Sequence, residues 1–410
     1  MGARGASILV AVVGAGAAGL MAAIFAARAG ARVVLLERTA DGGRKILASG
    51  GGRCNVLPAA AAPERFVSEA SASLVRRLLL AWPLAEQRRF FEQEIGLPLA
   101  LEEGTGKLFP ASNKARDVRD GLLALARREG VEVRFHSTME ALHREGSGWE
   151  IALTGLPPLQ AARVILATGG LSVPATGSDG IGLRALAALG HRMQPTYAAL
   201  TPLLCAPAPH AHLAGVSLDV ELRGAGGRPR TAGGFLFTHR GYSGPTVLDL
   251  SHLVTRARLR GEAIPVLRVR WRSIPDGAWE EALAPASRSA GAVLRAHLPA
   301  RLADQLLLEA GISPSRPLAQ LLRRDRTALL GLLTAYPLPC SGDEGYRKAE
   351  VTGGGLDLGE VDPRTLESRL HPGLHVCGEA LDAFGPIGGH NFQWAWSTSR
   401  TAGLAAGGLR

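Results

Sequence analysis

The first forty residues contain the feature that most constrains the fold. A short apolar run at 8–13 leads into the sequence GAGAAG, and a stretch of helix-forming composition at 17–29 is followed by a second apolar run at 32–36. A short, fully apolar run is typical of a central parallel strand. Strand, helix and strand within about thirty residues form a βαβ unit. The sequence therefore predicts an α/β fold with a parallel sheet.

The glycines of this unit have the spacing of a dinucleotide-binding turn. Gly14 permits the tight turn, Gly16 lets the backbone approach a pyrophosphate, and Gly19 lets the helix pack on the strand. The N–H groups at the helix N-terminus attract phosphate. Glu37 ends the second strand, 21 residues after Gly16, where a carboxylate accepts hydrogen bonds from ribose hydroxyls. A carboxylate here disfavours a 2′-phosphate, which leaves NAD and FAD as alternatives.

A second glycine-rich loop, GGRKILASGGGRCN at 42–55, combines backbone freedom with positive charge. FAD extends well beyond its pyrophosphate, so a further backbone cradle would have a role. We predict that Arg44 and Lys45 balance the charge of phosphate or of reduced flavin, that Gly51 lets main chain approach the cofactor, and that Cys54 and Asn55 lie near the ring. A mobile surface loop is the alternative, because glycine with arginine also occurs in RNA-contacting segments.

Two further glycine turns follow apolar strands. The first is ILATGG at 165–170, and the second lies in GEALDAFGPIGGHNFQWAWSTSR near the end of the chain. A helix predicted at about 391–402 would direct its N-terminus at the flavin, where it would stabilise the negative charge of the reduced ring. We predict Phe392, Trp394 and Trp396 as core residues of that helix.

The residue pattern of the sequence changes in the middle of the chain. Prolines and short alternating runs are followed by helical patterns. We therefore predict a discontinuous FAD-binding domain at 1–190 and 342–410. A substrate domain is inserted at 191–341, β-rich over 191–272 and helical over 273–341.

Composition narrows the class of protein. The formal net charge of +10 is compatible with RNA or another polyanionic partner. The four cysteines form no C-x-x-C pair, so we expect no metal site and a reducing cytoplasm. The glycines of the apolar N-terminal stretch favour strand, turn and helix over a membrane span or targeting segment. His210 and His212 lie between prolines and are expected to be exposed.

Four motifs together resemble one family. They are GAGAAGL, GRKILASGGGRCN, VTGGGLDLGEVDPRTLESRL and GEALDAFGPIGGHNFQWAWS. The chain looks like the HI0933-like flavoproteins, which include BaiN-type and aminoacetone-oxidase-type members, over essentially its whole length. The resemblance implies a Rossmann-like, two-dinucleotide-binding FAD domain, an inserted β-barrel-like and helical domain, and FAD held without a covalent bond.

The resemblance also implies roles for individual residues. The ADP half would be held by Gly14, Gly16, Gly19 and Glu37. The pyrophosphate and flavin would lie along Gly43, Arg44, Lys45, Cys54 and Asn55. The ribityl chain and ring would be covered by Gly378, Glu379, Gly388, Gly389 and Asn391. Further predicted cofactor contacts are Ala17, Ala18, Arg38, Gly51, Met139, Ala167, Thr168, Gly169 and His390.

One position departs from the family pattern. Many relatives have tyrosine where this chain has His390, and a histidine beside the flavin could titrate or donate a proton. We therefore predict His390 and Cys54 as catalytic residues, with a packing or hydrogen-bonding role for His390 as the alternative.

The predicted function is that of an FAD-dependent oxidoreductase. Because no second GxGxxG unit is present, NADH or NADPH would visit only transiently as electron donor. The predicted reaction is reduction of an activated C=C bond in a small molecule or in a nucleobase of RNA. The alternatives are an oxidase of a small amine that releases peroxide, and a non-catalytic flavin sensor or RNA-binding protein. Substrate identity and oligomeric state stay open.

Overall fold

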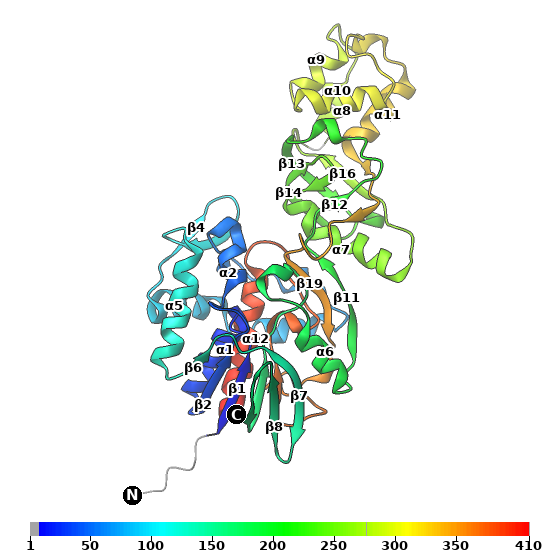
Figure 1. Cartoon of the computed structure of the whole chain (residues 1–410). Helices are drawn as coiled ribbons and strands as arrows, with labels where there is room; N and C mark the ends of the chain where they lie inside the picture. The colour runs from blue at the N-terminus through cyan, green and yellow to red at the C-terminus, as the bar shows by residue number, and fades with distance from the viewer. Residues whose placement is uncertain (1–7, 276, 410) are drawn as a thin grey trace, which may run out of the picture. The chain divides into compact units, whose positions relative to one another are not determined.

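The computed structural model describes residues 8–275 and 277–409, which form two compact units (Figure 1). The first unit runs to Thr196 and resumes at Glu350, and the second spans Tyr197–Ala349. Each unit has its own hydrophobic core. The first unit is therefore assembled from two separate stretches of the chain. Among the described residues, no helix is both long and apolar enough to cross a membrane.

The centre of the first unit is a five-stranded parallel sheet of order β20-β10-β1-β2-β6. Its strands are β1 (Leu9–Val13), β2 (Arg32–Leu36), β6 (Glu132–Arg134), β10 (Arg163–Leu166) and β20 (Leu374–Val376). Val13 lies level with both Leu36 and Leu166. Because parallel strands end at a common edge, the turns that follow β1, β2, β10 and β20 gather there, where ligands bind in sheets of this kind.

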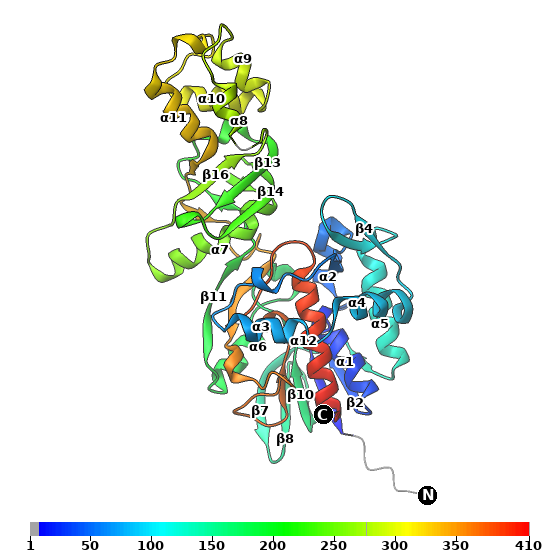
Figure 2. The same ribbon diagram turned by 180° about the vertical axis from the view of Figure 1, so that it is seen from behind.

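Helices cover this sheet, and two of them lie against each other. The helices are α1 (Ala17–Arg28), α2 (Arg44–Ala48), α3 (Ala72–Leu79), α4 (Leu84–Arg89), α5 (Ala115–Arg128), α6 (Ile181–Ala188) and α12 (His390–Gly407), with a π-helical turn at Phe90–Ile95. Helix α12 runs beside α1 in Figures 1 and 2. A Cβ at Gly403 would lie 2.5 Å from the carbonyl oxygen of Ala22. Glycine is therefore what permits this close approach.

Three small sheets complete the first unit. One has the order β3-β5-β4 and another the order β7-β8-β9, both antiparallel, and β11 pairs with β19. Their strands are β3 (Leu57–Pro58), β4 (Leu99–Glu102), β5 (Lys107–Pro110), β7 (Met139–Glu145), β8 (Gly148–Leu153), β9 (Leu156–Ala161), β11 (Met193–Ala199) and β19 (Val351–Leu356). The β11–β19 pair joins the first stretch of the unit to the second.

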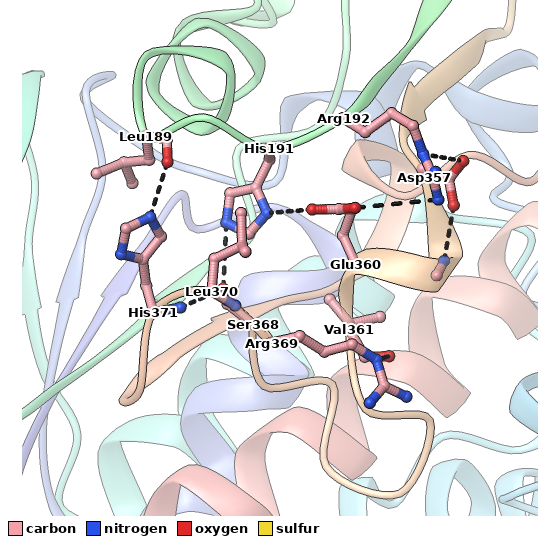
Figure 3. Close-up of polar contacts among 11 residues, drawn as sticks. Leu189, His191, Arg192, Asp357, Glu360, Val361, Ser368, Arg369, Leu370 and His371 are labelled. Atoms are coloured by element: carbon pink, nitrogen blue, oxygen red, sulfur yellow. Dashed lines mark hydrogen bonds and ion pairs between the residues drawn. The ribbon is translucent and has the colours of Figure 1, made fainter.

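A buried polar cluster makes a second connection between the two stretches (Figure 3). His191, just after α6, has its Nδ1 3.3 Å from the Glu360 carboxylate and its Nε2 3.2 Å from the Ser368 hydroxyl. His371 Nε2 lies 2.7 Å from the carbonyl oxygen of Leu189. We call His191, Glu360, Ser368 and His371 the histidine clasp. It holds the end of α6 against the segment that leads into β20.

The second unit contains a seven-stranded antiparallel sheet of order β17-β16-β13-β14-β15-β12-β18. Its strands are β12 (Leu203–Leu204), β13 (Ser217–Arg223), β14 (Arg230–Phe237), β15 (Gly241–Ser243), β16 (Leu267–Trp271), β17 (Tyr336–Leu338) and β18 (Gly342–Asp343). Its helices are α7 (Pro245–Arg260), α8 (Ala278–Ala282), α9 (Ala290–Arg295), α10 (Ala300–Glu309) and α11 (Arg323–Thr334).

Helix α7 lies inside the stretch 191–272 that the sequence predicts as β-rich. Its buried residues Val247, Leu250 and Val254 have helical spacing and join the core of the second unit. Short alternating runs on either side of α7 form strands, among them β13, β14 and β16. This helix therefore lies between strands of the stretch predicted as β-rich.

Candidate functional site

A cavity of about 580 Å³ lies in the first unit, at the sheet edge where the glycine turns gather. Most of the predicted cofactor residues line it: Gly14, Gly16, Ala17, Ala18, Glu37, Arg38, Gly43, Arg44, Lys45, Gly51, Asn55, Met139, Ala167, Thr168, Gly169, Glu379, Gly388, Gly389 and Asn391. They come from four separate turns, from the start of β7 and from the start of α12. The fold therefore brings together residues that lie more than 300 positions apart in the sequence.

The first glycine turn has the geometry that its spacing predicts. Gly14 has a φ of +99°, and a Cβ there would lie 2.7 Å from the carbonyl oxygen of Ala167. A Cβ at Gly19 would lie only 1.7 Å from the carbonyl oxygen of Gly14. At Gly16, by contrast, a Cβ would meet no protein atom within 4 Å. Gly14 and Gly19 are thus required by the fold, whereas Gly16 leaves open space in the cavity wall.

Glu37 is nearly buried at the end of β2 and is held by backbone N–H groups. One carboxylate oxygen accepts a hydrogen bond from Ala15 N–H at 2.8 Å. The other accepts from the N–H and hydroxyl of Thr39, at 2.8 and 2.7 Å. A carboxylate has about four acceptor positions. Glu37 is therefore fixed in orientation and keeps capacity to accept a further bond from a ligand hydroxyl.

The cationic loop at 42–55 is less free than its composition suggests. Arg44 Nε lies 2.8 Å from the Asp41 carboxylate. The Arg53 guanidinium lies 2.9 Å from Glu102 and over the ring of Phe109, with 4.1 Å between guanidinium carbon and ring centroid. The Arg44 charge that we predicted for phosphate is thus shared with an acidic side chain of the protein, and Arg53 of the same loop is paired in a similar way.

Lys45 is part of a partly buried network with Glu379. Its Nζ lies 2.7 Å from the Glu379 carboxylate and 2.7 Å from the Ser172 hydroxyl. Glu379 also accepts from the Ser172 hydroxyl at 2.8 Å and from Thr352 N–H at 3.0 Å. Burial acts to raise the pKa of Glu379, but the Lys45 charge and these hydrogen bonds outweigh it, so its pKa lies below the usual value. Glu379 is therefore ionised at neutral pH, and it lies beside Lys45 in the cavity wall.

Sequence reasoning missed Ser172 and Thr352. The Thr352 hydroxyl accepts hydrogen bonds from the N–H groups of Leu171 and Ser172, at 2.7 and 3.1 Å. It thereby fixes the turn after β10 against β19. The motif VTGGG contains this threonine and was available as a signal, but its partner lies 180 residues earlier. The cavity is also lined by Phe392 and Trp394, which the sequence predicts only as core.

Asn55 and Asn391 join the glycine loop to the start of α12. With the amide oriented to satisfy both of its neighbours, Asn55 donates to the carbonyl oxygen of Leu57 at 3.1 Å and accepts from Gly389 N–H at 3.0 Å. The Asn391 amide makes a pair of bonds with Gly385, at 2.9 and 3.0 Å. Both asparagines therefore shape the backbone beside the cavity.

Four predicted residues are not part of the cavity wall: Gly19, Cys54, Gly378 and His390. A Cβ at Gly378 would lie 2.7 Å from the Ala18 Cβ, so this glycine permits a close contact with α1. Cys54 is fully buried, and burial raises the pKa of its thiol to about 12. His390 packs edge-on against Phe66, and burial lowers its pKa to about 4. At neutral pH both side chains are uncharged. Their catalytic roles stay predictions.

In the histidine clasp, Ser368, His191 and Glu360 are linked by hydrogen bonds in the same sequence as the residues of a hydrolytic triad. The Ser368 hydroxyl, however, is not free to act as a nucleophile. The Ser368 hydroxyl oxygen accepts from Leu370 N–H at 3.1 Å and from His371 N–H at 2.9 Å. These bonds occupy its lone pairs, and the side chain is buried away from the cavity. The clasp is therefore a structural connection. Among residues 8–275 and 277–409, no group of His, Cys, Asp and Glu is placed to hold a metal ion.

The residues that line the cavity fit FAD. The N-terminus of α1 has no side-chain cap and no acidic residue in its first turn, so its N–H groups can bind phosphate. Gly16 leaves room for a pyrophosphate, and Glu37 is placed for a ribose. Within the described structure, the Thr168 hydroxyl is buried in the wall without a hydrogen-bond partner. A ligand with hydroxyl or phosphate groups would satisfy it.

The family comparison covers nearly the whole chain. Residues 8–405 match the family described as HI0933-like protein Rossmann domain. The chain is 34% identical to the ribosomal RNA dihydrouridine synthase of Escherichia coli, over 95% of each chain. It is 32% identical to the 3-dehydro-bile acid delta(4,6)-reductase of Clostridium scindens, over 97% of this chain and 98% of the relative.

Solved structures show the same fold at low identity. The 3-ketosteroid delta1-dehydrogenase of Sterolibacterium denitrificans superposes with a TM-score of 0.54 at 13% identity, over 98% of this chain and 99% of that chain. The 3-ketosteroid-delta4-(5alpha)-dehydrogenase of Rhodococcus jostii gives a TM-score of 0.52 at 17% identity, over 99% and 98%. These likenesses concern the fold alone. The family match, the full-length relatives and the cavity together confirm that this chain belongs to the HI0933-like family and is an FAD-dependent oxidoreductase.

Proposed function

We propose that this enzyme uses NADH or NADPH to reduce an activated C=C bond, and that the bond belongs to a uracil base of RNA. One observation carries the reaction type. Two full-length relatives, named as a dihydrouridine synthase and as a delta(4,6)-reductase, share this chemistry although their substrates differ. In both cases a conjugated double bond gains two hydrogen atoms. The shared part is the reaction, and this chain has a cavity whose lining fits the cofactor.

FAD, when bound, would supply the hydride transfer, and the chain's own residues would bind and orient it. Gly14, Gly16 and the α1 N-terminus would take the pyrophosphate, and Glu37 would take the adenosine ribose. Lys45 holds an ammonium group in the wall, fixed by Glu379 and Ser172. Such a fixed positive charge stabilises negative charge that develops nearby without reorganisation. We assign Lys45 and Glu379 this electrostatic role.

A transient nicotinamide donor agrees with the architecture. The described part of the first unit contains one parallel sheet with one GxGxxG turn. The nicotinamide would then approach the flavin from the substrate side and leave before the acceptor enters. We infer this sequential use of one site from the single dinucleotide-binding unit.

Charge distribution favours RNA over a small acceptor. Residues 197–349 contain 19 Lys and Arg against 12 Asp and Glu, a net charge of +7. The rest of the chain contains 27 against 24, a net charge of +3. Most of the positive excess therefore belongs to the second unit, whereas the residues that would hold the phosphates of the cofactor belong to the first. A small neutral acceptor such as an enone would not require it.

The test is a single-turnover experiment. The holoenzyme is reduced anaerobically with NADPH or NADH and then mixed with ribosomal RNA lacking dihydrouridine or with a steroid enone. In a separate experiment the oxidised holoenzyme is mixed with aminoacetone and oxygen. We expect flavin reoxidation by the RNA and a uridine nucleoside heavier by two hydrogen atoms in the digest. Reoxidation by the enone alone would identify the small-molecule reductase. Peroxide release driven by aminoacetone, with no bleaching by either nicotinamide, would support the oxidase and contradict the proposal.

A further inference from the structure

The central strands of the second unit present two very different faces. In β13, residues Leu218, Val220 and Leu222 point to one face and join the buried core, with Phe235 of β14 and Trp271 of β16. The intervening residues point to the opposite face, because successive side chains of a strand alternate. Figures 1 and 2 show β13, β14 and β16 side by side. One face is therefore apolar and covered, and the other is open to solvent.

Five arginines gather on the open face. Arg223 of β13 lies directly opposite Arg230 of β14 on one side and Arg268 of β16 on the other. Arg270 lies opposite Glu221, and the N–H of Arg272 bonds to the carbonyl oxygen of Asp219. We call Arg223, Arg230, Arg268, Arg270 and Arg272 the arginine face. Three of these side chains are exposed: Arg230, Arg268 and Arg272.

The spacing of these charges follows from sheet geometry. Adjacent strands lie about 4.8 Å apart, and residues on one face recur about every 6.7 Å along a strand. The row Arg230, Arg223 and Arg268 therefore crosses three strands within roughly 10 Å. Each end of the row lies about 4.8 Å from its centre, which is less than the Debye length of about 8 Å at physiological salt. An anion with closely spaced charges would contact several of them at once.

Acidic residues do not cancel this charge. Glu221 pairs with Arg223, and Asp219 is exposed at the far end of β13. The open face thus carries five positive and two negative charges. Arg268 is oriented by a hydrogen bond of 3.3 Å to the carbonyl oxygen of Ala335. The face has a net charge of +3 and accounts for a large part of the +7 of its unit.

The composition of the face indicates what it would bind. The other positions around the arginines include Ala232 and Gly234, and no aromatic residue occupies the open face among the described strand residues. Protein interfaces are enriched in aromatic anchors, and base recognition in single strands uses aromatic stacking. Arginines on a surface of small residues match phosphate instead, and phosphate contacts position a nucleic acid without reading its bases.

We propose that the arginine face binds the sugar–phosphate backbone of the RNA substrate, at nucleotides other than the one that is reduced. This inference rests on the proposed RNA substrate and adds the surface that binds it. The recognition is of folded RNA through its backbone, so it depends weakly on base sequence and strongly on salt. Guanidinium groups suit this role because their planar N–H pairs bind phosphate in a bidentate manner.

The test measures binding by the holoenzyme, without turnover. The probe is a fluorescein-labelled RNA hairpin with a uridine-rich loop, and its dissociation constant is followed by fluorescence anisotropy between low and moderate salt. The variant is Arg230→Gln, Arg268→Gln and Arg272→Gln together. Loss of three phosphate contacts should reduce the slope of log affinity against log salt by about 2 to 3. At near-physiological salt we expect at least a roughly tenfold weaker affinity.

A matched control removes the same charge from elsewhere in the same unit. The residues Arg240, Arg288 and Arg324 are exposed and lie off the open face, and their triple change to Gln should weaken binding less than about threefold. In the opposite direction, Asp219→Asn removes a negative charge from the face and should tighten binding a few-fold. Because misfolding cannot produce a gain of affinity, tighter RNA binding by the Asp219→Asn variant would support the arginine face even if the triple variant were unstable.

Each other outcome would overturn the proposal. Equal losses in the face variant and the control would mean that net charge alone attracts RNA. Tighter binding of a duplex DNA of equal length, or of vesicles containing anionic lipid, would mean that the partner is not RNA. Flavin content and anaerobic bleaching by NADPH are measured in every variant. If the unchanged holoenzyme has normal flavin content and bleaching but does not bind the hairpin, the arginine face is wrong and the reductase function still stands; if the reduced enzyme converts no RNA at all, the proposed substrate fails as well.

Discussion

The cavity of the first unit and the open face of the second are built in different ways. At the glycine turn beside the cavity, backbone atoms come so close together that glycine is required at Gly14 and Gly19. On the arginine face, the backbone is an ordinary antiparallel sheet, and only the outward side chains make it distinctive. A site built from backbone leaves a motif of fixed spacing in the sequence. A site built from alternating side chains leaves only a charge pattern. The first could therefore be recognised from the sequence, and the second required the register of the strands.

The largest expected effect tests whether close packing or ligand contact explains the glycine motif. Gly19→Ala would place a Cβ 1.7 Å from the Gly14 carbonyl oxygen, and we expect it to lower the free energy of unfolding of the apo protein by more than about 4 kcal/mol or to prevent folding. Gly16→Ala meets no atom within 4 Å and should cost less than about 1 kcal/mol. Urea denaturation of both variants measures the difference. Similar losses in the two would remove the distinction between the structural and the ligand-facing glycine.

In both units, a buried histidine should make the free energy of unfolding depend on pH under acidic conditions. Burial lowers the pKa of His252 in the second unit and of His390 in the first from 6.5 to about 4. Between these values the unfolded chain binds a proton that the folded chain does not, so the free energy of unfolding falls as pH falls from about 6.5 to 4. Each histidine contributes roughly 3 kcal/mol over this window. This part of the stability is fully present above pH 6.5.

The measurement is the free energy of unfolding as a function of pH for the protein and for His252→Gln and His390→Gln. Each single change should remove about 1.4 kcal/mol per pH unit from the slope in that window. A slope that neither variant alters would show that both histidines are protonated in the folded protein, contrary to their burial.

A smaller effect is expected from the ion pair in the cavity wall. Glu379→Gln leaves Lys45 without its counter-charge, and because both side chains are partly exposed we expect a loss of about 1–3 kcal/mol. Lys45→Met combined with Glu379→Gln should recover part of that loss, since no unpaired charge is left. A double-mutant cycle measures the coupling. Strict additivity of the two single changes would mean that the pair contributes nothing beyond its separate contacts.

The smallest effect concerns the histidine clasp. Ser368→Ala leaves the N–H groups of Leu370 and His371 without their acceptor and should cost about 1–2 kcal/mol. The rate of flavin reduction by NADPH should stay within about twofold of the unchanged enzyme, because the clasp lies outside the cavity. Thermal unfolding and stopped-flow absorbance are measured on the same sample. A much slower reduction in a variant of normal stability would give the clasp a part in catalysis and refute its structural assignment.

Local signals predicted local structure well. The expected strands at 8–13 and 32–36 and the helix at 17–29 correspond to β1, β2 and α1 with differences of one residue. The signals that predict these elements, namely apolar runs and the spacing of glycines, lie in consecutive residues of the sequence. The predicted family, the fold and the FAD-dependent oxidoreductase are likewise confirmed.

Contacts between distant residues could not be predicted in this way. His210 lies between prolines and was expected to be exposed, yet it is buried, with its Nδ1 2.8 Å from the Tyr242 hydroxyl and its Nε2 3.0 Å from that of Tyr336. These partners lie 32 and 126 positions away. For the same reason the pairing of Lys45 with Glu379, 334 positions apart, was missed although both residues were predicted at the site. The sequence identified the members of the site but not the bonds among them.

The most direct test of the account is the absorption spectrum of the purified protein before and after anaerobic addition of NADPH, with NADH in parallel. The account predicts about one FAD per chain, bleaching of its visible bands by a nicotinamide, and their return when RNA containing uridine is added. Protein that takes up no flavin even when FAD is supplied would contradict it, because the glycine turns, Glu37 and the Lys45–Glu379 pair would then surround a cavity with a different ligand.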